Sequence, residues 1–197
     1  MMTSHIINAI CKKILITYGD CDKFTFFNVP DVIRDTSLLK EFGFGYLGRG
    51  ATRIAFGNLH YVIKIGDPNN NVKELEASMV LDKHPILKYT KVPVFKHIEL
   101  SDHLSINITA RCREPKWSNT SRDNKADKIR NIMSSFYSDV GYANVGMFGK
   151  SLVMLDLNYP YVAEPDHYYV SEYKSLINFD AHKKTYDAKV NRLKLVA

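Results

Sequence analysis

The fold of this 197-residue chain is decided by the stretch LGRGATRIAF at positions 47–56 and the stretch YVIK at positions 61–64. The apolar patterns predict strands over 44–47, 52–56 and 60–65, with Gly57-Asn58 as a hairpin turn because both residues tolerate positive φ. Gly48 and Gly50 matter because backbone N–H groups reach phosphate oxygens only where no Cβ intervenes. The segment therefore predicts an antiparallel sheet with a glycine-rich, phosphate-binding turn.

Lys64 lies on the third predicted strand, where a cation can neutralise phosphate charge. A charged side chain in a half-buried strand needs an anionic partner. Two carboxylates follow on the helix predicted over 72–81, Glu74 and Glu76. We favour Glu76 as the partner, because it begins the apolar face that would pack on the sheet.

The remaining pattern predicts further elements on both sides of this segment. They are an apolar segment over 6–16, a short amphipathic helix over 31–42 with Val32, Leu38, Leu39 and Phe42 on one face, strands over 92–98 and 104–110, a loop over 114–125, a helix over 126–136, a hairpin of 145–148 with 152–155, and a polar helical tail over 171–195.

A second set of polar residues follows the predicted loop. Asp139 and Asn144 have the spacing D-x-x-x-x-N, and Asp156 ends the second strand of the predicted hairpin. Amide and carboxylate oxygens suit Mg²⁺, so Asn144 and Asp156 are candidate metal ligands and Asp139 is free to orient a hydroxyl nucleophile. In isolation, each motif is more typical of residues that cap a turn or end a strand.

Taken together, residues 44–156 resemble the protein-kinase-like fold, an α+β architecture with an antiparallel small lobe, one main helix and here a much reduced helical C-terminal lobe. The resemblance implies that Gly48 and Gly50 cover ATP phosphates, that Lys64 pairs with Glu76, that Asp139 is the catalytic base, and that Asn144 and Asp156 bind Mg²⁺. It also implies that 111–114 is the adenine hinge. In its small size the chain is most similar to bacteriophage-encoded serine/threonine kinases, which phosphorylate host proteins during infection.

The resemblance implies three parts: an N-terminal extension over 1–42, a nucleotide-binding small lobe over 43–114 and a reduced lobe over 115–197. Several positions depart from the family pattern. Arg53 replaces the third loop glycine and could stiffen the loop or add a cation. Tyr137-Ser138 replaces His-Arg before Asp139, and Asp156-Leu157-Asn158 replaces Asp-Phe-Gly. The helical platform that holds peptide substrates is mostly missing after Asp156.

Three functions follow from these residues. The favoured one is ATP- and Mg²⁺-dependent transfer of a phosphoryl group to serine or threonine hydroxyls of a protein, with Lys64 and Asp139 as catalytic groups. The alternative is a catalytically inactive kinase-like module that binds and modulates a host protein. A small-molecule phosphotransferase is the third, and is disfavoured because such enzymes usually carry a larger substrate lobe.

Composition sets the remaining expectations. The chain has 45% hydrophobic residues, no apolar run long enough to span a membrane, and three cysteines without CxxC spacing, so we expect a cytoplasmic protein with reduced thiols. The net charge is +6. Apart from a run from Lys183 to Lys194, Lys and Arg are spread along the chain, so we favour a protein substrate or host partner over direct nucleic-acid binding. The oligomeric state is left open.

Overall fold

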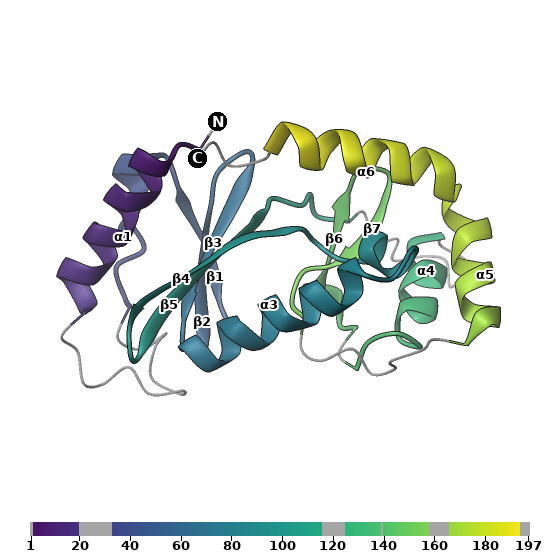
Figure 1. The fold of residues 1–197 in the computed structure, drawn as a ribbon, viewed down its shortest axis with the longest axis horizontal. Helices are drawn as coiled ribbons and strands as arrows, with labels where there is room; N and C mark the ends of the chain where they lie inside the picture. The colour runs from purple at the N-terminus through teal and green to yellow at the C-terminus, as the bar shows by residue number, and fades with distance from the viewer. Residues whose placement is uncertain (1, 20–32, 116–124, 139, 158–165, 194–197) are drawn as a thin grey trace. The chain divides into compact units, whose positions relative to one another are not determined.

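The computed structural model describes residues 2–19, 33–115, 125–138, 140–157 and 166–193 (Figure 1). The chain divides into two compact units. Unit 1 comprises 1–75, 94–111 and 193–197, and unit 2 comprises 76–93 and 112–192. The predicted boundary near residue 114 lies close to the change of unit after Arg111, whereas residues 76–93 group with unit 2 and the N-terminal segment groups with unit 1.

Unit 1 is built on an antiparallel sheet of five strands in the order β1-β2-β3-β5-β4. The strands are β1 Gly45–Arg49, β2 Arg53–Gly57, β3 Tyr61–Gly66, β4 Val94–Ser101 and β5 Leu104–Ala110. The predicted strands are thus confirmed. The turn at Gly57-Asn58 has a different cause from the one expected, since neither residue has positive φ. Instead, the Asn58 carboxamide oxygen accepts hydrogen bonds from the N–H groups of His60 and Tyr61 at 2.8 Å each.

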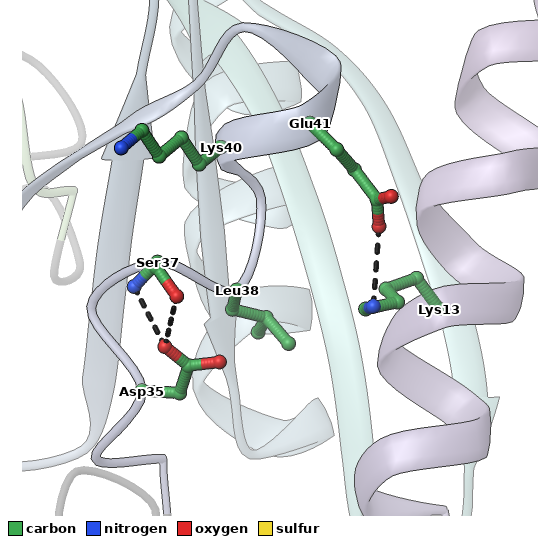
Figure 2. A pocket seen from close by; sticks show the side chains of 6 residues that line it. All are labelled: Lys13, Asp35, Ser37, Leu38, Lys40 and Glu41. Carbon is green, nitrogen blue, oxygen red and sulfur yellow. Dashed lines mark hydrogen bonds and ion pairs between the residues drawn. The ribbon is translucent and has the colours of Figure 1, made fainter.

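Helix α1, Ser4–Tyr18, packs against β4 of the same unit and buries Ile7, Ile10 and Ile14. Thr3 begins it, because the threonine hydroxyl accepts from the Ile6 N–H at 3.4 Å. An ion pair of 3.2 Å joins Lys13 of α1 to Glu41, as Figure 2 shows. This pair is exposed on both sides and contributes little to stability.

The helix predicted over 31–42 is wrong for its described part, which contains turns and the short 3₁₀ helix η1, Lys40–Phe42. The Asp35 carboxylate accepts from both the N–H and the hydroxyl of Ser37, at 2.8 and 2.6 Å (Figure 2). Such local bonds compete with helical ones. Leu38 and Leu39 are nevertheless buried, so the apolar part of the prediction is confirmed.

Helix α3, Pro68–Asp82, begins four residues before the predicted helix because Asp67 caps it. The Asp67 carboxylate accepts from the N–H groups of Asn69 and Asn70, at 2.8 and 3.3 Å. Asn69, Asn70 and Asn71 therefore lie in the first turns of the helix. Residues through Leu75 belong to unit 1, and residues from Glu76 belong to unit 2.

Unit 2 contains the two-stranded sheet of β6, Val145–Phe148, and β7, Ser151–Met154, which confirms the predicted hairpin. Its helices are α4 Lys125–Met133, α5 His167–Ile177 and α6 Phe179–Leu193, with the 3₁₀ turns η2 Leu87–Thr90 and η3 Tyr142–Asn144. The apolar core includes Leu81, Met133, Leu152 and Tyr173. The predicted tail helix is two helices, because Asn178 between them takes the left-handed conformation with φ 51°.

Candidate functional site

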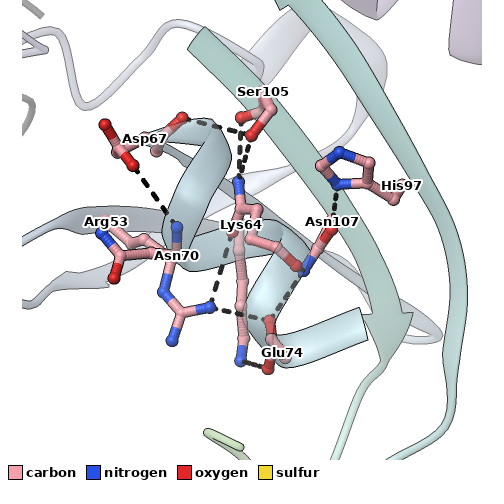
Figure 3. Close-up of polar contacts among 10 residues, drawn as sticks. Arg53, Lys64, Asp67, Asn70, Glu74, His97, Ser105 and Asn107 are labelled. Atoms are coloured by element: carbon pink, nitrogen blue, oxygen red, sulfur yellow. Dashed lines mark hydrogen bonds and ion pairs between the residues drawn. The ribbon is translucent and has the colours of Figure 1, made fainter. Parts of the chain in front are cut away.

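The register of the unit 1 sheet places three polar side chains on one face. Lys64 of β3 lies opposite Ala55 of β2 and opposite Asn107 of β5, while Arg53 lies two positions from Ala55 on β2. Because side chains alternate along a strand, Arg53, Lys64 and Asn107 share a face. The Glu74 side chain of α3 is held among them (Figure 3).

Glu74 is the ion-pair partner of Lys64, and the expected partner Glu76 is wrong. The Lys64 ammonium contacts the first carboxylate oxygen of Glu74, whose side chain is 0% exposed. Glu76 is exposed and lies in the part of α3 that belongs to unit 2. Two residues along a helix turn a side chain to a different face, so only one of the two glutamates can meet the sheet.

Arg53 also binds Glu74, through its Nη1 and the second carboxylate oxygen at 2.7 Å. Its side chain is only 11% exposed, so it points into the sheet face instead of adding a cation to the glycine-rich turn. Gly66, opposite Arg53 in the register, makes this possible. A Cβ on Gly66 would lie 2.5 Å from the Arg53 Cγ and 2.8 Å from the Thr52 carbonyl oxygen.

The charge balance at Glu74 keeps the carboxylate ionised. Burial is the largest influence and raises its pKa, but Lys64, Arg53 and the hydrogen bond from Asn107 together lower the pKa below its ordinary value. A buried carboxylate with two cations and an amide donor is a satisfied anion. The Lys64 ammonium is therefore held by a permanent negative charge.

Asn107 connects this cluster to the rest of the sheet. Its amide nitrogen donates to Glu74 and to the Asn71 carbonyl, at 2.9 Å each, and its carbonyl oxygen lies 2.8 Å from the His97 Nδ1. Asn71 in turn donates to Ser105 at 2.9 Å. The polar groups fix α3 on the sheet, and the sequence pattern gave no signal of Asn107 beyond a polar residue in an apolar strand.

The glycine-rich turn is the β1–β2 hairpin. The Gly50 N–H donates to the Arg53 carbonyl at 2.8 Å and closes the turn. Gly48 has a φ of 156° beside an irregularity in the β1–β2 register, with open space where a Cβ would stand. The two glycines thus lie where the sequence places them, at the end of β1 and at the start of the turn.

Unit 2 brings Asn144 and Asp156 to neighbouring positions. The Leu155 N–H donates to the Asn144 carbonyl at 2.8 Å, so the residue preceding Asp156 is bonded directly to Asn144. One amide oxygen and one carboxylate oxygen fit Mg²⁺, which retains several waters and takes few protein ligands. Within the described residues, no group of three or more His, Cys, Asp or Glu side chains could hold a metal.

Asp139 lies outside the described residues. Described residues on both sides of it, Tyr137 and Val140, form hydrogen bonds with other elements of unit 2. Tyr137, two residues before Asp139, is buried and bonded through its hydroxyl to the Thr90 hydroxyl. Burial raises the Tyr137 pKa strongly, so this phenol stays neutral. On the other side, Arg130 of α4 donates to the Val140 carbonyl at 3.1 Å. Neither anchor was expected from the sequence.

At the predicted adenine hinge, Arg113 is already bonded through its backbone. Its N–H donates to the Met147 carbonyl at 3.0 Å, and its carbonyl accepts from the Met147 N–H at 2.8 Å. The Arg111 N–H donates to the His60 carbonyl at 2.8 Å. The backbone donors of these two residues are therefore already used within the protein, and Trp117 lies outside the described residues.

No family model matches the chain, and no curated protein sequence matches it. Among solved structures, a co-crystal structure of WbdD and the kinase inhibitor LY294002 is similar, with a TM-score of 0.43 and 13% sequence identity. The match covers 75% of this chain and 46% of that chain, so the present chain spans less than half of the other's length. In the parts of the chain that the structure describes, no helix has the length and apolar character needed to cross a membrane.

Proposed function

We propose that this protein is a kinase-like phosphotransferase that uses ATP and Mg²⁺. The observation that carries the proposal is the buried Lys64–Glu74 pair on the sheet that also forms the glycine-rich β1–β2 turn. A lysine fixed by a helix carboxylate is suited to neutralising phosphate oxygens, because its position is set before the ligand arrives. Gly48 and Gly50 would then let the backbone of this turn approach the phosphates closely, because neither residue carries a Cβ.

Asn144 and Asp156 would hold Mg²⁺, which neutralises the charge that develops on the transferred phosphoryl group. The hydrogen bond from Leu155 to Asn144 supports this assignment, because it joins Asn144 to the residue that precedes Asp156. Asp139 would accept or orient the proton of the attacking hydroxyl. Of the described residues on either side of Asp139, Tyr137 is bonded to Thr90 of η2, and the Val140 carbonyl accepts from Arg130 of α4.

The finer assignment follows the sequence resemblance. We propose protein serine or threonine hydroxyls as acceptors, in the manner of small bacteriophage kinases that act on host proteins in the cytoplasm. Ser138 in place of the usual arginine supports activity that does not depend on a phosphorylated activation loop, since a serine hydroxyl cannot pair with a phosphate as a guanidinium does.

The test is transfer of label from γ-labelled ATP with Mg²⁺, to the protein itself and to a bacterial lysate. Lys64→Met and Asp156→Asn should each abolish transfer, whereas Asp102→Asn, at an exposed turn position in unit 1, should retain it. Phosphoamino-acid analysis of labelled bands should give phosphoserine or phosphothreonine. Transfer that persists in both site variants contradicts the proposal.

The inactive binding module remains a second candidate because of Arg53. Glu74 already holds two cations without any nucleotide, so the cluster satisfies itself as a structural element. ATP binding separates the two functions: an inactive module gives neither transfer nor a rise in melting temperature with Mg²⁺ and ATP, whereas the enzyme gives both.

A further inference from the structure

Unit 2 carries a groove of about 730 Å³ that the proposed phosphotransfer does not use. Its wall is one face of α6, and its opposite side comes from Arg113 and from Gly149-Lys150 at the β6–β7 turn. Lys189 of α6 lies 4.5 Å above the ring centroid of Phe148, the last residue of β6, which holds the two sides together. All residues that line the groove lie between 112 and 192, within unit 2.

The lining is strongly cationic. Five of its side chains are Arg113, Lys150, Lys184, Lys189 and Arg192, and no carboxylate lines the groove in the part of the chain that the structure describes. None of the five forms an ion pair with a described carboxylate. Burial lowers the pKa of Lys189, Cys112 acts in the opposite direction, and the positive charge of Arg113 lowers the pKa again. Like charges gathered without a counter-ion attract an anion.

The shape of the groove is set by small residues. On α6 the positions between the cations are Ala181, Thr185 and Ala188, each three or four residues from the next, so they form the floor on one helix face. Lys184 and Arg192 are eight residues apart and therefore about 12 Å apart along the axis. The cations follow a line instead of converging on one point, which favours an extended ligand with charge repeated along its length.

We propose that this groove binds the sugar-phosphate backbone of double-stranded nucleic acid without reading its sequence. Duplex DNA carries a phosphate about every 3.4 Å along each strand, so the α6 cations can face several successive phosphates. Among the described residues no aromatic ring lines the groove, so unpaired bases have no ring on which to stack, which favours a duplex over a single strand. An acidic peptide fits less well, because the lining has no large apolar side chain to anchor it.

The position of the cations in the fold explains more than the net charge does. The sequence shows a basic run from Lys183 to Lys194, and the fold adds Arg113 and Lys150 to it from segments far apart in the chain. Lys183 itself does not line the groove. The cations that matter are therefore those on one helix face together with two from outside the run.

The test is the fluorescence anisotropy of a labelled DNA duplex about two helical turns long, titrated with the full-length protein at several KCl concentrations between about 50 and 200 mM. We expect affinity to fall with salt at a slope of about 0.9 logarithmic units per phosphate contact. Lys184→Gln with Arg192→Gln should reduce the slope by roughly one for each residue and weaken binding equally for unrelated sequences.

The matched control is Lys12→Gln with Lys73→Gln, which removes the same charge from exposed positions in unit 1. This control should keep the slope of the unmodified protein. Equal losses in the two double variants would overturn the proposal, as would tighter binding of single strands than of duplex. Displacement of the duplex by polyglutamate at matched charge concentration would also overturn it, since attraction to any polyanion would then explain the binding. The readout needs no ATP, so it is independent of phosphotransfer.

Discussion

At the scale of single residues, the stability of the site depends on which glutamate of α3, Glu74 or Glu76, is buried against Lys64 and Arg53. Glu74 is 0% exposed and holds Lys64 and Arg53, whereas Glu76 is exposed. Replacing Glu74 with Gln leaves two cations without their anion, and we expect a loss of about 3–5 kcal/mol in the free energy of unfolding. Urea denaturation followed by circular dichroism measures this loss.

The matched control is Glu76→Gln, which should change the free energy of unfolding by no more than about 0.5 kcal/mol. The two substitutions are chemically identical and lie two positions apart on the same helix. Equal effects of the two would show that the buried pair does not contribute as the structure indicates.

The lowered pKa of Glu74 gives a pH dependence with a defined sign. Because the folded protein binds the proton at Glu74 more weakly than the unfolded chain does, the stabilisation is complete above the ordinary pKa of 4.5 and is lost as pH falls through the folded value. The difference in urea midpoint between the unmodified protein and Glu74→Gln should therefore be constant near neutrality and shrink below about pH 4.5. A difference that grows as the pH falls would reverse the assigned direction.

At the scale of elements, Gly66 at the end of β3 makes room for the Arg53 side chain. A Cβ there would approach Arg53 Cγ to 2.5 Å and the Thr52 backbone oxygen to 2.8 Å, and a backbone oxygen cannot rotate away. We expect Gly66→Ala to destabilise the protein by about 1–3 kcal/mol through overpacking. It should also weaken the proposed ATP binding, because the strain falls on the β1–β2 turn.

Gly45→Ala is the control for this prediction. It lies in β1 of the same sheet, and its nearest contact for a new Cβ is the Gly57 carbonyl oxygen at 4.0 Å. It should leave the melting temperature and ATP affinity unchanged within error. Unchanged stability and ATP affinity in Gly66→Ala would contradict the prediction, because they would show that the Arg53 side chain does not depend on the space left by Gly66.

The elements also show what a sequence can and cannot predict. The β1–β2–β3 strands and the β6–β7 hairpin were predicted correctly, because glycine and asparagine turns and apolar alternation are local signals. The helix predicted over 31–42 is wrong in its described part, because the Asp35–Ser37 bonds, which are also local, favour a turn. The partner of Lys64 could not be settled, since it depends on which face of α3 meets the sheet. That face is set by Asn71 and Asn107, whose contacts join distant segments.

At the scale of the whole molecule, neither unit is a continuous stretch of chain. Residues 76–93 belong to unit 2, although they lie between segments of unit 1. The Val92 N–H donates to the Met154 carbonyl at 2.8 Å, and the Tyr186 hydroxyl donates to the Lys91 carbonyl at 3.0 Å. A small lobe cut at residue 114, as the sequence resemblance suggests, would lose both bonds.

We therefore expect a fragment of residues 1–114 to be incompletely folded. It keeps every strand of the five-stranded sheet, but Leu81 and Leu87 lose the core they share with Leu152 and Met154, and apolar surface is exposed. The fragment should bind the dye ANS and give poorly dispersed amide resonances, as chains without fixed packing do. Expression together with 115–197 returns every one of these contacts and should suppress dye binding. Cooperative unfolding of the fragment 1–114 by itself would contradict this prediction, because the fragment would then be a stable folding unit that ends at residue 114. Residues 76–93 would in that case be stabilised chiefly by the sheet to which α3 connects them.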